Sequence, residues 1–140
     1  MTVTEYRPSL TAGIRLLARL SRVAETAFQE AGISLPQYRL LVELSKCPQR
    51  AGELAAELGV SRPTVTSLVD GLERNGLLLR IRVNGDRRGV RLETTPAGRR
   101  ALARAEAALA ERLSPLLDAR SAARADDLVS ALARALENGG

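Results

Sequence analysis

Residues 51–76 read AGELAAELGVSRPTVTSLVDGLERNG, and this stretch predicts two short helices joined by a tight turn. Apolar residues recur at helical spacing over residues 51–58, and Gly59 is suited to end that helix because glycine tolerates a left-handed backbone. Ser61 is suited to cap a second helix over residues 62–75. Two short helices joined in this way form a helix-turn-helix.

The second of these helices has two unlike faces. Apolar residues follow one face, whereas small hydroxyl residues and two arginines lie on the other. Small side chains let a helix approach base edges, and the positive N-terminal end of the helix dipole favours phosphate. The pattern favours a helix that reads duplex DNA, although the solvated face of an ordinary bundle has a similar polarity. The candidate DNA contacts on it are Ser61, Arg62, Pro63, Thr64, Thr66, Ser67 and Arg74.

A period of two follows Gly76 and predicts a β-hairpin. Apolar residues and arginines alternate over residues 77–83, residues 84–88 read NGDRR as a turn, and the alternation resumes at residue 90. A two-stranded hairpin is barely stable alone, so we expect it to pack on the helices with its tip exposed. Arginines at such a tip can enter a minor groove, and the competing interpretation is a solubilising turn. The candidate contacts are Arg82, Arg87 and Arg88.

The positive charge of the chain is local. The net charge is +5, and residues 61–100 hold nine basic and four acidic residues, whereas the rest of the chain is balanced. The chain contains no histidine, one cysteine, two tyrosines and one phenylalanine. These counts argue against histidine-based catalysis, disulfide frameworks, the common zinc sites and a surface that stacks on unpaired bases. We therefore expect duplex DNA as the partner, and no enzyme, cofactor or metal.

Length and hydropathy favour one domain. A chain of 140 residues, 45% of them hydrophobic, suits a single folded unit. Its first residues show no basic region followed by an apolar stretch, and no apolar run is long enough to span a bilayer. We therefore expect a cytoplasmic protein without a membrane partner.

Helices are predicted on both sides of the hairpin and the helix-turn-helix. Apolar spacing predicts a helix over residues 9–31, and Ser34 with Gln37 forms the capping box of a helix that starts near Leu35. Another helix starts at Thr95 with Pro96 and is interrupted near residues 114–115. A last helix follows, and Asp126 and Asp127 are expected in its first turn.

The terminal helices carry apolar stripes without an obvious partner in residues 33–98. We expect them to interlock with a second subunit, while the alternative is that they cover their own subunit. The fold class is therefore mainly α with a small β-hairpin wing: a dimerisation helix over 1–32, a winged helix-turn-helix over 33–98, and dimerisation helices over 99–140. The candidate dimer contacts are Leu10, Ile14, Leu17, Leu116, Leu128, Leu132 and Leu136.

Residues 33–98 resemble the multiple-antibiotic-resistance regulator (MarR) family of bacterial transcription factors. The matching pieces are ISLPQYRLL, ELAAELGVSRPTVTSLVDGLERNGL, DRRGV and TTPAG, in this order and spacing. The resemblance implies a homodimer that binds a pseudo-palindromic operator, usually as a repressor released by a small molecule or an oxidant. It also implies that residues 61–67 form the recognition segment. Asp86 and Arg88 match the family's D-x-R wing motif, with Arg88 as the groove-inserting residue.

The sequence departs from the family pattern in the helix and in the wing. The family often has Arg where Gly71 stands, and that Arg can pair with the wing aspartate; Arg74 is a candidate substitute. Arg91 and Thr94 stand where the family usually has apolar residues, which predicts a less buried second strand.

Two questions stay open: whether the chain binds DNA at all, and what role its one thiol has. A winged helix can also serve as a protein-interaction module without DNA binding. Cys47 lies beside Lys46 and would suit an oxidant sensor, although a structural cysteine is the stronger interpretation. The sequence does not identify an effector; Tyr38 is a candidate pocket residue or a core residue.

Overall fold

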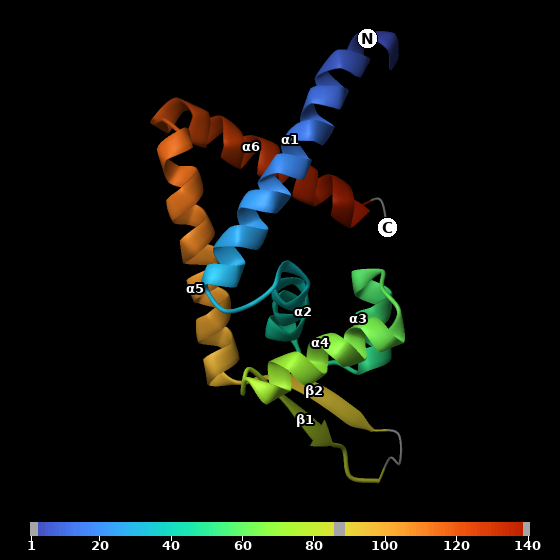
Figure 1. Ribbon diagram of the computed structural model, residues 1–140. Helices are drawn as coiled ribbons and strands as arrows, with labels where there is room; N and C mark the ends of the chain where they lie inside the picture. The colour runs from blue at the N-terminus through green and yellow to red at the C-terminus, as the bar shows by residue number, and fades with distance from the viewer. Residues whose placement is uncertain (1–2, 86–88, 139–140) are drawn as a thin grey trace. The chain divides into compact units, whose positions relative to one another are not determined.

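The computed structural model describes residues 3–85 and 89–138, and the side chains of residues 3–10, 119 and 122 lie outside that description. The chain forms two compact units, Met1–Leu109 and Ala110–Gly140. Most of the described chain is helical, with one antiparallel hairpin, which confirms the prediction of a mainly α fold with a small β-hairpin (Figure 1). The elements are α1 (Val3–Glu30), α2 (Leu35–Lys46), α3 (Ala51–Leu58), α4 (Arg62–Arg74), β1 (Leu78–Arg82), β2 (Val90–Thr94), α5 (Pro96–Leu113), the 3₁₀ turn η1 (Ser114–Leu116) and α6 (Ala119–Asn138).

Local capping residues set the limits of α1 and α2. α1 begins six residues before the predicted start, because apolar spacing marks only the part of a helix that packs on a core. The helix ends at Glu30, one residue before the predicted limit, and Gly32 follows at φ 92°. The predicted capping box is confirmed, since the Gln37 amide donates to Ser34 Oγ at 3.2 Å and the Ser34 amide to Gln37 Oε1 at 2.9 Å.

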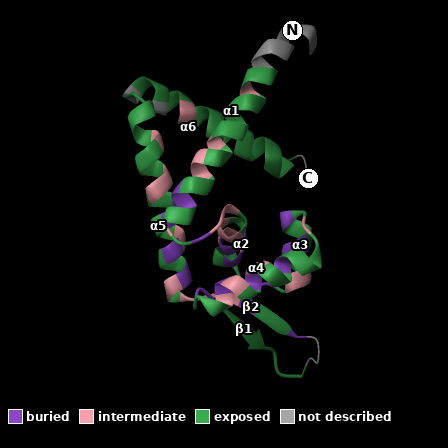
Figure 2. Cartoon of the chain, in the orientation of Figure 1, coloured by how far each residue is buried: buried purple, intermediate pink, exposed green. Residues whose placement is uncertain are grey.

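The core lies between α2, α4 and the adjoining parts of α1, α3, α5 and the hairpin (Figure 2). Burial of a leucine or valine side chain contributes about 1.5–3 kcal/mol, so the burial of Val65, Val69 and Leu72 in this cluster stabilises the position of α4. The largest fully buried side chains are Phe28, Leu40, Leu41, Leu54, Leu72, Leu78, Val65 and Val69.

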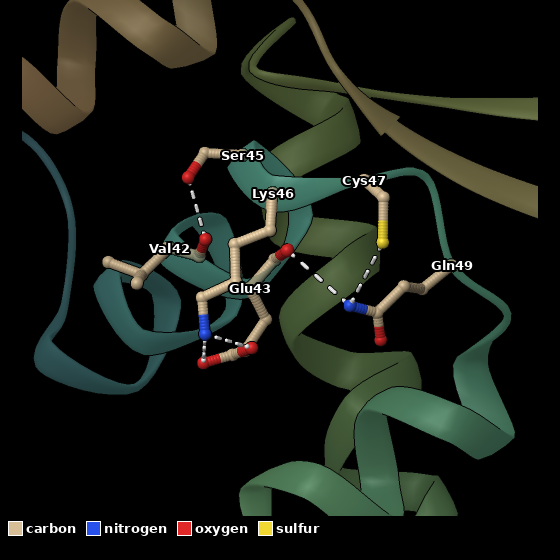
Figure 3. A network of polar contacts seen from close by, with 6 residues as sticks. All are labelled: Val42, Glu43, Ser45, Lys46, Cys47 and Gln49. Carbon is tan, nitrogen blue, oxygen red and sulfur yellow. Dashed lines mark hydrogen bonds and ion pairs between the residues drawn. The ribbon is translucent and has the colours of Figure 1, made fainter. Parts of the chain in front are cut away.

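The hairpin is fastened to the helices along one edge. β1 pairs with β2 from Leu78 opposite Thr94 to Arg82 opposite Val90. Beyond β2, the Gln49 amide donates to the Leu92 carbonyl at 3.2 Å, and the Leu92 amide donates back at 2.8 Å. The side chain of Gln49 is buried and reaches the end of α2, where its Nε2 donates to the Glu43 carbonyl at 3.4 Å (Figure 3). Gln49 therefore joins the wing to α2.

The second unit corrects one expectation about the last helix. α6 begins at Ala119, so Asp126 and Asp127 lie two turns inside it and not in its first turn. The cap is instead Asp118, whose Oδ1 accepts from the Ser121 amide at 2.6 Å. This backbone hydrogen bond lowers the pKa of the Asp118 carboxyl. The predicted interruption near Pro115 is confirmed by η1.

Candidate nucleic-acid interface

The turn between α3 and α4 presents the N-terminal end of α4 to solvent. Gly59 adopts φ 64° and closes α3, as the sequence predicts. Ser61 then caps α4, because its Oγ accepts from the Thr64 amide at 3.3 Å. The hydroxyls of Ser61 and Thr64 lie 2.8 Å apart, and both residues are exposed. The first turn of α4 therefore exposes hydroxyls at the positive end of the helix dipole, an arrangement suited to an anionic partner.

The two faces of α4 are separated as the sequence predicts. Val65, Val69 and Leu72 are at most 1% exposed and fix the inner face on the core. The outer face is a shallow groove without bulky apolar side chains. The Thr66 hydroxyl donates to the Arg62 carbonyl at 3.1 Å, which leaves its oxygen available as an acceptor. The groove is lined by Arg62, Pro63, Thr66, Ser67, Asp70 and Arg74.

Arg80 on β1 pairs with both acidic residues of α4, a contact that the sequence analysis missed. Its Nη2 lies 2.5 Å from Asp70 Oδ1, and its Nη1 lies 2.9 Å from Glu73 Oε1. The hydrogen bond to Asp70 raises the pKa of the Arg80 guanidinium further above its ordinary value. The pairs reduce the negative charge at the outer face of α4 and connect that helix to the wing. Arg80 lies seven and ten residues along the chain from these two carboxylates and on a different element, so the spacing of charges in the sequence does not predict the pairing.

Gly71 is explained by a close approach from α2. A Cβ atom at this position would lie 3.0 Å from Nε2 of Gln37, the residue that completes the capping box of α2. A larger side chain would have to displace that amide. Arg74 is exposed at the end of α4, and its predicted pairing with Asp86 concerns a residue outside the described part of the chain.

The wing places Arg82 in solvent, and Asp86, Arg87 and Arg88 lie outside the described residues. The Val83 amide donates to the Gly89 carbonyl at 2.7 Å, which continues the ladder toward the tip. The two strands bury one side chain each: Leu78 on β1 and Leu92 on β2. Leu79, which belongs to the predicted apolar alternation, is 53% exposed. As expected from Arg91 and Thr94, only Leu92 of the second strand is buried.

Tyr38 and Cys47 lie in different surroundings. The ring of Tyr38 stacks on Phe28 with centroids 4.3 Å apart, and its hydroxyl donates to Glu106 Oε1 at 3.2 Å. Burial raises the pKa of the Tyr38 hydroxyl, with a smaller effect of Glu106. Cys47 is exposed at the end of α2, and its Sγ lies 3.9 Å from Gln49 Nε2 (Figure 3). Tyr38 therefore has a packing role that needs no ligand.

The candidate dimer residues with described side chains are all exposed in the single chain, by 55–79%. They are Ile14, Leu17, Leu116, Leu128, Leu132 and Leu136. Leu10 belongs to α1, and its side chain is outside the description. Within the described residues, no group of three or more Cys, Asp or Glu side chains could hold a metal ion. No helix in that part of the chain combines the length and the apolar character needed to cross a membrane.

Comparisons with known proteins agree with this geometry. A model of the MarR family matches residues 31–89, and no curated protein sequence matches the chain. The transcriptional repressor CouR, solved bound to a 23-mer DNA duplex, is 33% identical, and the match covers 89% of each chain with a TM-score of 0.72. The regulator BldR from Sulfolobus solfataricus is 27% identical over 99% of each chain, with a TM-score of 0.72. A MarR family protein from Bacillus stearothermophilus shares the fold, with 24% identity over 99% of this chain and 94% of that chain and a TM-score of 0.76.

Proposed function

This chain belongs to the MarR family of DNA-binding transcriptional regulators, and from that premise we propose that it is a homodimeric repressor of a pseudo-palindromic operator. A small molecule or an oxidant releases it from the operator. The proposal assigns residues 33–98 to DNA binding, and residues 1–32 and 99–140 to dimerisation. Binding and release of DNA involve no chemical reaction, so no residue is assigned a catalytic role.

The observation that carries the proposal is the exposed outer face of α4. This face combines hydroxyls, a capped N-terminal end and two arginines on a helix whose opposite side buries Val65, Val69 and Leu72. The likeness to CouR supports DNA as the partner, since that repressor was solved on a duplex. Thr64, Thr66 and Ser67 are the side chains we assign to base edges, while Arg74 and Arg82 contact the backbone.

A dimer fits the proposal because apolar side chains at both ends of the chain are exposed. Two copies related by a twofold axis place two α4 helices in successive major grooves, about 34 Å apart. The operator then carries two half-sites whose symmetry mirrors that of the protein.

The wing tip is assigned to the minor groove beside each half-site, with Arg88 as the inserting residue and Asp86 and Arg87 next to it. Replacing Arg88 by alanine (Arg88→Ala) is expected to weaken operator binding and to remove any A·T preference at the operator flanks. Footprints of wild type and variant on one duplex measure this. Unchanged protection at the flanks would show that the tip stays outside the groove.

Selection of duplexes from a random-sequence pool tests the proposed function. The expected result is an enriched inverted repeat with half-sites separated by about one helical turn, roughly 10 base pairs. An enriched site without inverted symmetry would contradict the dimeric arrangement. Failure to retain any duplex, together with a stable complex with a protein, would favour the interaction module instead.

A further inference from the structure

The N-terminal ends of α3 and α4 meet at one close approach. Gly52, the second residue of α3, would place a Cβ atom 2.6 Å from Nη2 of Arg62 and 3.4 Å from its Nε and Cζ atoms. Carbon side chains almost never come within 3.0 Å of such a neighbour. The guanidinium of Arg62 therefore fills the space that any larger residue at position 52 would occupy.

This contact sets the direction of the first side chain of α4. Arg62 is the first residue of that helix, and its guanidinium lies back against the first turn of α3, which packs beside α4 (Figure 1). Arg62 is also one of the residues that line the outer groove. Thr66 and Ser67 lie a turn further along, in the part of the groove assigned to bases.

The charge of Arg62 is available to a ligand. The residue is exposed, and within the described part of the chain no carboxylate forms an ion pair with it. In a helix-turn-helix, the first helix crosses the sugar-phosphate backbone while the second enters the major groove. A guanidinium held against the first helix is therefore placed for a phosphate, to which arginine can donate two parallel hydrogen bonds.

We propose that Gly52 is a positioning residue: the space left by its missing side chain lets the Arg62 guanidinium lie at the DNA backbone, so that Arg62 contributes affinity without reading sequence. The inference rests on the proposed function and assigns one contact within it. The three atoms nearest to a methyl group at position 52 all belong to the far end of the flexible Arg62 side chain. The methyl group also raises helix propensity, so the folded state accepts the change while the guanidinium moves.

A double-variant cycle on the full chain tests the positioning role. The four proteins are wild type, Gly52→Ala, Arg62→Ala and the double variant, titrated by fluorescence anisotropy against the duplex selected by wild type and a shuffled duplex of equal composition. We expect Arg62→Ala to lower the affinity for both duplexes by a similar factor, about tenfold. The slope of the logarithm of the binding constant against the logarithm of the salt concentration should become less steep by about 0.9 for each lost phosphate contact. We expect Gly52→Ala to lower the affinity for both duplexes by roughly threefold to tenfold, and the double variant to have the same affinities as Arg62→Ala.

Ala56→Gly is the matched control, because it changes the helix propensity of α3 at an exposed position without adding an atom near Arg62. It should keep wild-type affinity, and Gly52→Ala should unfold at no lower temperature than wild type. The inference is overturned if Gly52→Ala weakens binding equally with and without Arg62, or if Arg62→Ala spares the shuffled duplex. Failure of wild type to bind either duplex would instead remove the proposed function, and this inference with it.

Discussion

Carboxylates on a DNA-facing helix repel phosphate unless a cation lies beside them. Asp70 and Glu73 stand on α4, and the guanidinium of Arg80 meets both across the gap to β1. Because its guanidinium is paired with two carboxylates, Arg80 contributes less to phosphate binding than its place in a basic segment suggests. A count of charges along the chain cannot separate a committed arginine from an available one, because the pairing depends on how β1 folds back on α4.

Arg80→Gln should therefore loosen the wing. Each exposed ion pair contributes about 0.2–1 kcal/mol, so we expect a loss of about 1 kcal/mol in the free energy of unfolding, measured in urea at low salt. Amide hydrogens of β1 and β2 should exchange faster. Arg82→Gln is the control, because Arg82 lies two residues along the same strand and the described structure shows no ion pair for it. Equal losses in the two variants would contradict the pairing as the cause.

At the scale of elements, the sequence predicts the helices best where caps and apolar spacing agree. α3 and α4 begin and end within a residue or two of their expected limits, and α2 begins where expected, because Ser34, Gly59 and Ser61 act through local backbone contacts. One feature depends on tertiary packing: the hairpin turns Leu79 outward because Arg80 at the next position faces α4. The cap of α6 is local, since Asp118 accepts from the Ser121 amide three residues along, but it lies ahead of the apolar stripe on which the prediction rested.

Ser34→Ala tests the capping box as a local device. Loss of the hydroxyl leaves the Gln37 amide without its acceptor, and we expect about 1 kcal/mol of destabilisation in urea unfolding. Affinity for DNA should stay unchanged under conditions in which the variant is folded, since the box lies at the start of α2. If Ser34→Ala costs as much in a Gln37→Ala background as alone, the two side chains do not act as one unit.

Across the whole molecule, the exposed apolar residues at both ends of the chain support the proposed dimer. Leu132 of α6 is 55% exposed, and we assign it to the dimer interface. Leu132→Glu should raise the dimer dissociation constant by about 100-fold or more, since two copies lose the burial of a leucine. Sedimentation velocity over a range of concentrations measures this. Ser130→Glu, an equally charged change on the same helix, should remain dimeric; dissociation of both variants to the same extent would argue for a general charge effect.

Salt dependence also belongs to the whole molecule. Residues 61–100 carry the entire net charge of +5, and a dimer presents two such segments to one duplex. If several phosphates are neutralised per dimer, raising salt from about 50 to about 200 mM should weaken binding by roughly 10³-fold or more. A flat titration would show that the basic segment does not meet the backbone.

The most direct test of the account is a hydroxyl-radical footprint of the wild-type chain on its selected duplex. We expect two equal protected segments on one face of the DNA, with centres about 10 base pairs apart and additional minor-groove protection outside each. A single asymmetric segment, or two segments without flanking protection, would contradict a dimer that reads DNA through α4 and the wing.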